Sequence, residues 1–424
     1  MISIEQIRNN VENVRKQLSL KGDTSSIDTI VSMDESYRSH ISQSNELRAK
    51  RNKVSEEIAA AKKSGKSADQ EVQAMRQVGD QIKLIEQKAN NIKNELDALL
   101  LVLPNLPHKT TPLGKNNTEN KLVREWGKEK NKDFELKTHL ELGTDLGLFD
   151  FEAAAKISGS GFPLYKDMGA KLERALINYM LDYQTKNHGY REIFPPFMVR
   201  GNSPLTTGNL PKFSDDMYHI ESDNLWMIPT AEVPITNLHQ DEILSEDELP
   251  LKYAAYSACF RREAGSHGKD TKGLLRLHQF NKVELVQFVT PESSYDMLEE
   301  LTLHAESILQ SLGLKYRVME LCTGDLSFAA AKCYDLELWA PAEEKWLEVS
   351  SCSNFESFQS RRGKIRYRKS KDDNVDFVHT LNGSGVATPR LLVSLIETYQ
   401  NSDGSIFVPE PLQPYLGLEV IDLS

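Results

Sequence analysis

The sequence has few cysteines and no long apolar run, and these absences narrow the classes of protein to consider. Its four cysteines form no CxxC pair and have no histidines nearby at the spacing of metal ligands. We therefore expect reduced thiols, with neither a disulfide framework nor a zinc site. The longest apolar run, ALLLVL (98–103), is too short to span a bilayer, and the N-terminus has no signal-peptide pattern. These features predict a cytoplasmic protein that does not enter a membrane.

The balance of charge is acidic. Aspartate and glutamate number 62 against 51 lysines and arginines, which gives a formal net charge of −11. This excess argues against binding of nucleic acid by the whole surface, but a local basic patch remains compatible with it. The 424 residues exceed the usual size of a single hydrophobic core, so the length favours two domains.

The first hundred residues carry the repeat of a coiled coil. From Met75 to Leu103, apolar residues recur at alternating intervals of three and four positions, which places them along one side of a helix. A weaker repeat of the same kind runs from Tyr37 to Ala61. Between the two repeats lies KKSGKSADQ (62–70), whose glycine is typical of a helix end. Two such helices joined by a short turn predict an antiparallel two-helix arm.

A proline-rich segment follows the predicted arm. VLPNLPHKTTPLG (102–114) contains three prolines, which end helices and are typical of a linker. We therefore expect an N-terminal helical domain over residues 1–108 and a second domain over residues 109–424.

Basic residues gather near the tip of the predicted arm. A charge run most often forms a solvated face of a coiled coil. The alternative is an arm that binds along a nucleic-acid backbone, where lysine and arginine neutralise phosphates. The arm alone does not decide between the two. The basic residues are Arg48, Lys50, Arg51, Lys53, Lys62, Lys63 and Lys66.

Two segments of the second part predict a pair of strands that carry charges among core-like residues. The first contains CFRREAG (259–265), and the second is GLLRLHQFNKVELVQFV (273–289). If residues 257–263 form a strand, Arg261 and Glu263 share one of its faces. Charges placed in this way need an opposite charge or a ligand.

The second strand is expected to begin near Leu275. On it, Arg276, Phe280 and Glu284 have the same parity, so their side chains would share one face. The pair would then offer a phosphate clamp (Arg261 and Arg276), an aromatic plate and a carboxylate for an ammonium group. An internal ladder of arginine–glutamate salt bridges is an equally good explanation of these strands alone.

Two further segments carry polar residues at positions suited to a ligand. LWMIPTAEVPITN (225–237) is expected to be a loop that presents Thr230 and Glu232. TLNGSGVATPRLLVSLIETYQ (380–400) is expected to run from a loop into an amphipathic helix. Arg390 would stand at the start of that helix, where an anion is readily bound.

EKWLEVSSCSNF (344–355) is expected to be a strand with Glu348 and Ser351 three residues apart. A carboxylate and a hydroxyl are oxygen ligands, which Mg²⁺ prefers. An isolated pair of this kind is more often ordinary surface.

Together these segments resemble the class II aminoacyl-tRNA synthetases, and in particular the bacterial-type seryl-tRNA synthetases. A helix predicted over 170–188 and the strand REIFPPFMV (191–199) resemble motif 1 of the class. FRRE (260–263) through QFNKVE (279–284) resembles motif 2, and NGSGVATPR (382–390) resembles motif 3. PTAEVP, LEVSSCSNF, TLNGSG and LPNLPH followed by REWG are similar to the seryl enzymes in particular.

The resemblance implies an α+β fold, with an N-terminal antiparallel two-helix coiled-coil arm and a class II catalytic domain whose antiparallel sheet is flanked by helices. It implies a homodimer that activates L-serine with ATP and Mg²⁺, without zinc, and transfers it to tRNA(Ser). The arm would bind the long variable arm of that tRNA. Charging of tRNA(Sec) is a further activity of the family.

The resemblance also implies roles for individual residues. Arg261 and Arg390 would serve catalysis, Phe280 would stack on adenine, and Glu348 with Ser351 would bind Mg²⁺. The implied ATP-binding residues are Arg261, Arg262, Glu263, Arg276, Phe280, Glu348, Val349, Ser350, Ser351 and Arg390. The implied serine-binding residues are Thr230, Ala231, Glu232, Glu284, Asn382 and Ser384.

Two other proteins with this catalytic domain are alternatives. A catalytically inactive paralogue that binds RNA would be expected to have lost Arg261, Glu284 or Arg390, and all three are present. An aminoacyl-carrier-protein ligase would lack the N-terminal arm, which the coiled-coil repeat predicts here.

Overall fold

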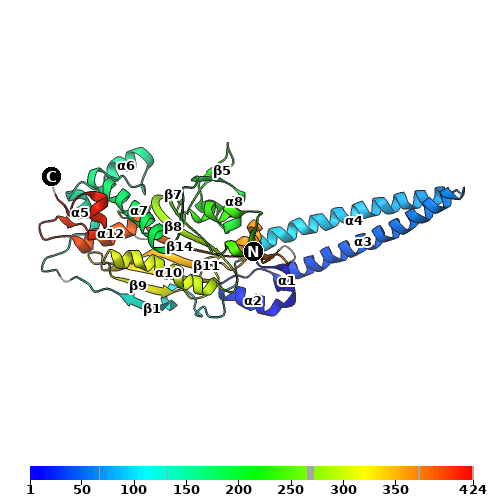
Figure 1. Ribbon diagram of the computed structural model, residues 1–424, viewed down its shortest axis with the longest axis horizontal. Coiled ribbons are helices and arrows are strands. Elements are labelled where there is room, and N and C mark those ends of the chain that lie inside the picture. Colours follow the sequence, from blue (N-terminus) through cyan, green and yellow to red (C-terminus); the bar gives the residue numbers. More distant parts are fainter. Residues whose placement is uncertain (66, 131, 265–271, 371–372, 423–424) are drawn as a thin grey trace. The chain divides into compact units, whose positions relative to one another are not determined.

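The computed structural model (Figure 1) describes residues 1–65, 67–130, 132–264, 272–370 and 373–422. The chain forms two compact units. One comprises Met1–Ser19 and Asp23–Pro104, and the other comprises Leu20–Gly22 and Asn105–Ser424. Among the described residues, every helix is too short or too polar to cross a membrane.

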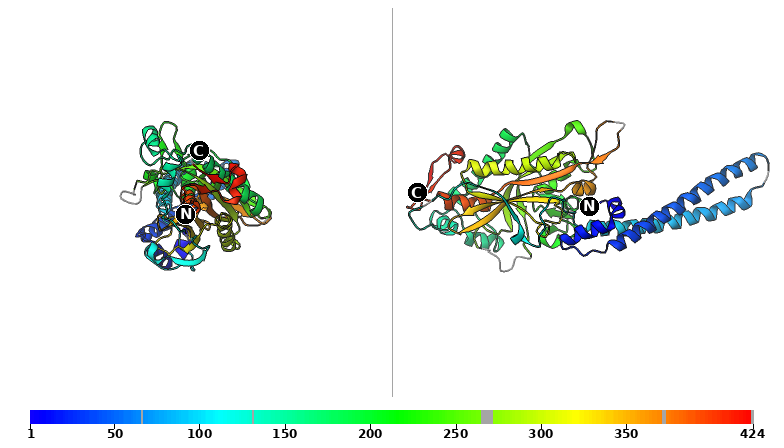
Figure 2. Two further views of the ribbon diagram at one scale, coloured as in Figure 1. Left: turned by 90° about the vertical axis from the view of Figure 1, so that its left-hand side faces the viewer. Right: turned by 90° about the horizontal axis from the view of Figure 1, so that it is seen from below.

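The first unit is built around a helical hairpin. Helices α3 (Ile27–Lys63) and α4 (Asp69–Leu101) lie side by side along their lengths (Figures 1 and 2), and the shorter helices α1 (Ile4–Asn9) and α2 (Val11–Leu20) precede them. Gly65 follows α3 with a φ of 75°, a left-handed conformation that glycine adopts without steric cost. The predicted antiparallel two-helix arm is confirmed.

The apolar repeat of α4 lies on the side of the helix that faces α3. Ile82, Ala89 and Leu96 are buried, and the other apolar positions of the repeat are buried or only partly exposed. Burial of this seam removes apolar surface from water, at about 25 cal/mol per Å², and so holds the two helices together.

The second unit is organised by one large sheet. Its strands lie in the order β1, β9, β10, β11, β14, β8, β7 and β2. β2 pairs with β7 in parallel, and the other neighbouring strands are antiparallel, which confirms the predicted type of sheet. The bounds are β1 Lys121–Trp126, β9 Tyr316–Glu320, β10 Lys332–Ala340, β11 Lys345–Asn354, β14 His379–Ala387, β8 Gln279–Val289, β7 Leu251–Phe260 and β2 Arg191–Ile193.

Helices and small sheets surround this sheet. The helices are α5 His139–Asp145, α6 Phe151–Ser158, α7 Asp167–His188, α8 Asn202–Thr207, α9 Glu232–Thr236, α10 Ser294–Ser311, α11 Phe358–Gly363, α12 Thr388–Tyr399 and α13 Gln413–Leu416. The strands of the small sheets are β3 Met198–Arg200, β4 His219–Ile220, β5 Leu225–Met227, β6 Ile243–Ser245, β12 Arg366–Arg368, β13 Asp376–Phe377, β15 Ile406–Phe407 and β16 Val420–Ile421.

The main core lies between one face of the large sheet and the helices α7, α10 and α12 (Figure 1). On β8, Val283 and Leu285 point into this core, whereas Val286 and Phe288 belong to a second apolar cluster on the other face. The alternation follows from the pleat of a strand. By the same alternation, Phe280, Lys282 and Glu284 share the face of β8 on which Val286 and Phe288 lie.

The strands around motif 2 begin and end elsewhere than the sequence predicted. β7 ends at Phe260, so Arg261 and Glu263 follow the strand instead of extending it. β8 starts at Gln279 rather than near Leu275. The connection between the two strands includes residues 265–271, which lie outside the described residues.

Three other local predictions were also wrong in part. The predicted strand 191–199 is interrupted at Pro195 and Pro196 into β2 and β3, which belong to different sheets, because proline lacks the N–H that a ladder needs. Residues 379–387, expected to be a loop, form β14, which pairs with both β8 and β11. Glu232 was expected in a loop and instead begins α9.

The buried seam of the arm leads to a test of its stability. Replacing Ile82 with alanine should lower the free energy of opening of α3 and α4 by about 2–5 kcal/mol, because it leaves a cavity between the helices. Amide hydrogen exchange in the full chain should therefore become markedly faster in both helices. Leu84→Ala is the matched control, since Leu84 lies on the same helix and is 55% exposed. Equal exchange in the two variants would contradict the hairpin packing described above.

Candidate active site

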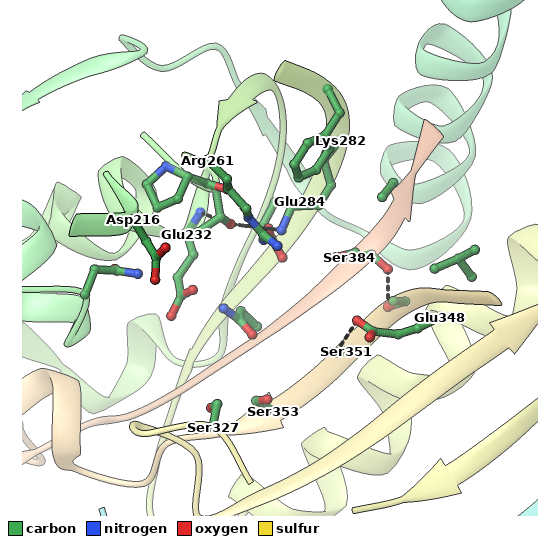
Figure 3. A pocket seen from close by; sticks show the side chains of 18 of the residues that line it. Asp216, Glu232, Arg261, Lys282, Glu284, Ser327, Glu348, Ser351, Ser353 and Ser384 are labelled. Carbon is green, nitrogen blue, oxygen red and sulfur yellow. Dashed lines mark hydrogen bonds and ion pairs between the residues drawn. The ribbon is translucent and has the colours of Figure 1, made fainter. Parts of the chain in front are cut away.

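A pocket of about 810 Å³ lies over the second face of the sheet, where β8, β11 and β14 meet the start of α12. It brings together almost all of the residues predicted to bind ATP or serine (Figure 3). Those that line it are Thr230, Glu232, Arg261, Glu263, Arg276, Phe280, Glu284, Glu348, Val349, Ser350, Ser351, Asn382, Ser384 and Arg390.

Two of the predicted residues lie outside this lining. The side chain of Arg262 is exposed, and its backbone N–H donates to the carbonyl oxygen of Asp216 at 2.9 Å. Ala231 is fully buried in the second apolar cluster, behind Thr230 and Glu232. Their assignments to ATP and serine stay predictions.

One end of the pocket holds a buried carboxylate with a hydroxyl and an ammonium group. Thr230 Oγ1 donates to Glu284 Oε2 at 2.5 Å. Lys282 forms an ion pair with the same carboxylate and donates to Thr230 Oγ1 at 3.0 Å. The strand pairing sets this arrangement, because Glu284 lies opposite Ser384 of β14. A negative charge buried at this depth requires such partners.

A second carboxylate, that of Glu232, lies close to the first. Gln359 donates to its Oε1 at 2.6 Å. Burial and, to a smaller extent, the charge of Glu284 raise the pKa of Glu232 to about 7. The neutral form of Glu232 is therefore favoured to a higher pH than that of an exposed glutamate, and a ligand with a positive charge or a hydrogen-bond donor would favour its ionised form.

The other end of the pocket presents arginines and an aromatic ring. The Arg261 guanidinium carbon lies 5.1 Å from the centroid of the Phe280 ring. Glu263 and Arg276 form an ion pair across the pocket wall. Glu263 has a φ of 51°, which is uncommon for a residue other than glycine and is often found at functional sites.

These contacts bear on the salt-bridge explanation of motif 2. Glu263 is paired with Arg276, and Glu284 is paired with Lys282, so ion pairs between residues of this region do exist. They do not form a ladder along two strands, because Glu263 and Arg276 lie outside β7 and β8. Both pairs instead line the pocket, within reach of a ligand.

Arg390 stands at the start of α12, as predicted, and reaches the pocket. Its Nη1 donates to the backbone oxygen of Glu348 at 2.7 Å, and its Nε donates to the backbone oxygen of Leu275 at 3.2 Å. Pro389 lies in the first turn of α12, where a missing N–H costs no helical hydrogen bond. The N-terminus of α12 and the positive side chain of Arg390 therefore lie together at the wall of the pocket.

An oxygen-rich group lies on β10 and β11 beside Arg390. Ser351 Oγ lies within hydrogen-bond distance of Asp335 Oδ1 (2.6 Å) and Glu348 Oε1 (3.2 Å). Figure 3 shows Glu348 and Ser351 together, on the side of the pocket away from Glu232. Burial and the nearby charge of Glu348 raise the pKa of Asp335 well above its ordinary value. The group consists of oxygen donors, which fits Mg²⁺.

Sequence reasoning missed two of these residues, although a signal existed for one. Lys282 has the same parity on β8 as Phe280 and Glu284, so the alternation of the strand places it in the pocket. Asp335 lies opposite Ser351 across the β10–β11 ladder. That pairing joins residues of two different sequence segments, so no local sequence pattern predicts it.

A buried glutamate connects two parts of the pocket from behind. Glu173 of α7 accepts hydrogen bonds from Asn281 Nδ2 of β8, at 2.8 Å, and from Thr388 Oγ1 at the start of α12. Burial raises the pKa of Glu173 to about 7. Asn281 follows Phe280, and Thr388 precedes Arg390 by two positions, so one side chain anchors both elements.

A different group of side chains could in principle ligate a cation. Nδ1 of His139 and carboxylate oxygens of Glu343 and Glu397 lie within 4.8 Å of one another. Glu397 already accepts hydrogen bonds from the backbone N–H groups of His139 and Ala342, at 3.0 and 3.1 Å. These contacts account for its burial. The group contains no cysteine, and the expected absence of zinc stays a prediction.

The basic residues of the arm lie near its tip in α3. The side chains of Lys50, Lys53, Lys62 and Lys63 are exposed. Arg48 forms an ion pair with Glu86 of α4 at 2.6 Å, so it links the two helices. Lys66 lies outside the described residues.

Comparison with known proteins covers both units. The model of the seryl-tRNA synthetase N-terminal domain matches residues 1–107, and that of the tRNA synthetase class II core domain (G, H, P, S and T) matches residues 216–399. Serine--tRNA ligase of Chlorobaculum parvum is 52% identical over the full length of both chains. That of Carboxydothermus hydrogenoformans is 50% identical over 99% of each.

Solved structures give the same result. Seryl-tRNA synthetase from Pyrococcus horikoshii, complexed with ATP, superposes with a TM-score of 0.95, at 36% identity over the whole of both chains. Cytoplasmic serine-tRNA ligase from Naegleria fowleri, in complex with AMP, has a TM-score of 0.89 at 30% identity, over 100% of this chain and 99% of that one. The two-helix arm and the antiparallel sheet agree with these likenesses. The chain belongs to the seryl-tRNA synthetase family.

Proposed function

We propose that the chain is a serine–tRNA ligase, which activates L-serine with ATP and transfers the seryl group to tRNA(Ser). The observation that carries the proposal is the division of one pocket into two ends. Buried carboxylates and hydroxyls at one end suit the ammonium and hydroxyl groups of serine. Arginines and an aromatic ring at the other end suit the phosphates and the base of ATP.

In the first step, a carboxylate oxygen of serine attacks the α-phosphorus of ATP. The bond from that phosphorus to the bridging oxygen of the β-phosphate breaks, and pyrophosphate leaves with the electron pair. Arg261 would stabilise the charge that develops on the α-phosphate, and Arg276 and Arg390 would hold the outer phosphates. No side chain needs to remove a proton, because the nucleophile is already ionised.

Asp335, Glu348 and Ser351 would hold Mg²⁺ beside these phosphates. The support for this is the all-oxygen donor set and its position next to Arg390. The ion would neutralise charge on the phosphates that leave as pyrophosphate.

In the second step, a hydroxyl oxygen of the 3′-terminal ribose of the tRNA would attack the carbonyl carbon of the seryl-adenylate. The bond from that carbon to the phosphate oxygen would break, AMP would leave with the electron pair, and the hydroxyl proton would be released. We propose that the domain over 1–108 binds tRNA(Ser) through the exposed basic residues of its arm, and that the domain over 109–424 holds the catalytic pocket. Family membership also supports a homodimer in the cytoplasm that works without zinc. The pairing of Arg48 with Glu86 suggests a structural role for that residue beside any contact with tRNA.

The first prediction tests amino-acid activation. Serine alone among the twenty amino acids should support ATP–pyrophosphate exchange without tRNA. Arg261→Ala should lower kcat/KM for exchange by about 10²- to 10³-fold, the usual loss when a donor to a developing charge is removed. Arg366→Ala is the control, since Arg366 lies on β12 away from the pocket. Exchange with another amino acid would overturn the serine assignment, and no exchange by the folded protein would favour the inactive paralogue.

The second prediction concerns the pH dependence of serine recognition. Glu232 has a raised pKa of about 7, so its carboxylate becomes protonated as the pH falls through 7 and then binds serine less well. The KM for serine should rise about tenfold from pH 8 to pH 6, as expected for one group with this pKa. Glu232→Gln should bind serine weakly and show no such rise. An unchanged pH profile in Glu232→Gln would exclude Glu232 as the titrating group.

The third prediction tests the arm. Replacing Lys50, Arg51, Lys62 and Lys63 together with glutamine should raise the KM for tRNA and reduce its dependence on salt, because each lost phosphate contact lowers the salt slope by about 0.7–0.9. Serine-dependent pyrophosphate exchange should not change, since that reaction needs no tRNA.

The control for this experiment removes as many charges from the second unit. The control variant replaces four lysines whose side chains are 63–72% exposed, and they are Lys156, Lys186, Lys364 and Lys369. Equal effects of the two sets on tRNA would show that only net charge matters and would remove the arm as the contact surface.

A further inference from the structure

The ammonium group of Lys282 lies where the proposed function requires the ammonium group of serine. It contacts both Glu284 and Thr230, which are the acceptors proposed for the substrate. The side chain of Lys282 is 8% exposed and that of Glu284 is 2% exposed. Two ammonium groups cannot occupy the same position, so serine must displace Lys282 or bind elsewhere.

Lys282 makes the contacts that the ammonium group of an amino acid would make. Glu284 needs a positive partner, since a buried carboxylate without one is strongly disfavoured. Among the described residues, Glu284 forms its ion pair with Lys282. Thr230 bridges Lys282 and Glu284, because its hydroxyl donates to Glu284 and accepts from Lys282. Lysine is suited to such a role, since its charge stands on a flexible stem of four carbons.

We propose that Lys282 exchanges partners when serine binds. Its ammonium group would release Glu284 and pair with the carboxylate of the amino acid instead. This inference rests on the proposed function. In the structure the pair is Lys282 with Glu284. In the complex the pairs are the serine ammonium with Glu284 and Lys282 with the serine carboxylate. The number of ion pairs rises by one, and no charge is left buried without a partner at either stage.

The exchange makes Lys282 a specificity-determining residue. A ligand with an ammonium group but no carboxylate would displace Lys282 and give it no new partner. Ethanolamine is such a ligand, because it has the ammonium and hydroxyl groups of serine and lacks the carboxylate. Lys282 would therefore disfavour simple amines and favour amino acids.

The test compares the two ligands on the full-length protein. The KM of serine and the inhibition constant of ethanolamine are measured in serine-dependent ATP–pyrophosphate exchange, for the natural chain and for Lys282→Met. The variant should bind serine about 10- to 100-fold more weakly, the range for loss of a hydrogen bond between charged groups. It should bind ethanolamine equally well or more tightly, because nothing competes for Glu284.

The control variant is Lys252→Met. Lys252 lies on the neighbouring strand β7, and its partly buried side chain forms an ion pair with Glu300 at 2.5 Å, outside the pocket. It should leave the ratio of the two constants unchanged. If Lys282→Met weakens both ligands equally, Lys282 only holds Glu284 and Thr230 in place, and the inference is wrong. An unchanged or tighter constant for serine would also overturn it.

A structural measurement on the natural chain does not depend on the folding of the variant. In a crystal structure with serine and a non-hydrolysable ATP analogue, Lys282 Nζ should lie within hydrogen-bond distance of the serine carboxylate. Nζ still paired with Glu284 would overturn the inference. These failures are distinct from failure of the proposed function, which would appear as the absence of serine-dependent exchange in the natural chain.

Discussion

The register of β8 between β7 and β14 is the constraint on which the pocket depends. Its even-numbered residues Phe280, Lys282 and Glu284 line the pocket, and the odd-numbered Val283 and Leu285 fill the core under α7, α10 and α12. A shift of one residue would exchange these two sets. It would place two charges in the main core and two aliphatic side chains in the pocket. The packing of the core thus specifies the positions of the chemical groups.

The same register explains why the pocket tolerates so many charges. Buried carboxylates are stable only beside donors or cations, and the ladder places Glu284 opposite Ser384 and near Thr230. Glu232 enters from α9 and receives its hydrogen bond from Gln359 of α11. The polar groups therefore come from several elements that meet only in the folded chain. These polar groups satisfy one another by hydrogen bonds, and their charged side chains line the pocket.

The sequence predicted the elements that have a strong local period or a distinctive motif. The repeat from Met75 to Leu103 predicted the arm. Of the sixteen residues that motif resemblance assigned to ATP or serine, fourteen line the pocket. Strand limits were less accurate, because the charged residues after Phe260 continue the alternation of a strand beyond the point where pairing ends. Asp335 was not found, since its link to Ser351 depends on a ladder between distant residues.

Glu173 has a consequence for the mobility of the end of the pocket that holds Phe280 and Arg390. It holds Asn281 beside Phe280 and Thr388 beside Arg390, so the aromatic ring and the arginine share one anchor on α7. A common anchor reduces independent fluctuation of the two groups. The spacing between the Phe280 ring and the Arg390 guanidinium is then set when the chain folds. Less conformational entropy then remains to be lost when a ligand binds both groups, and preorganisation of this kind favours affinity without adding a contact.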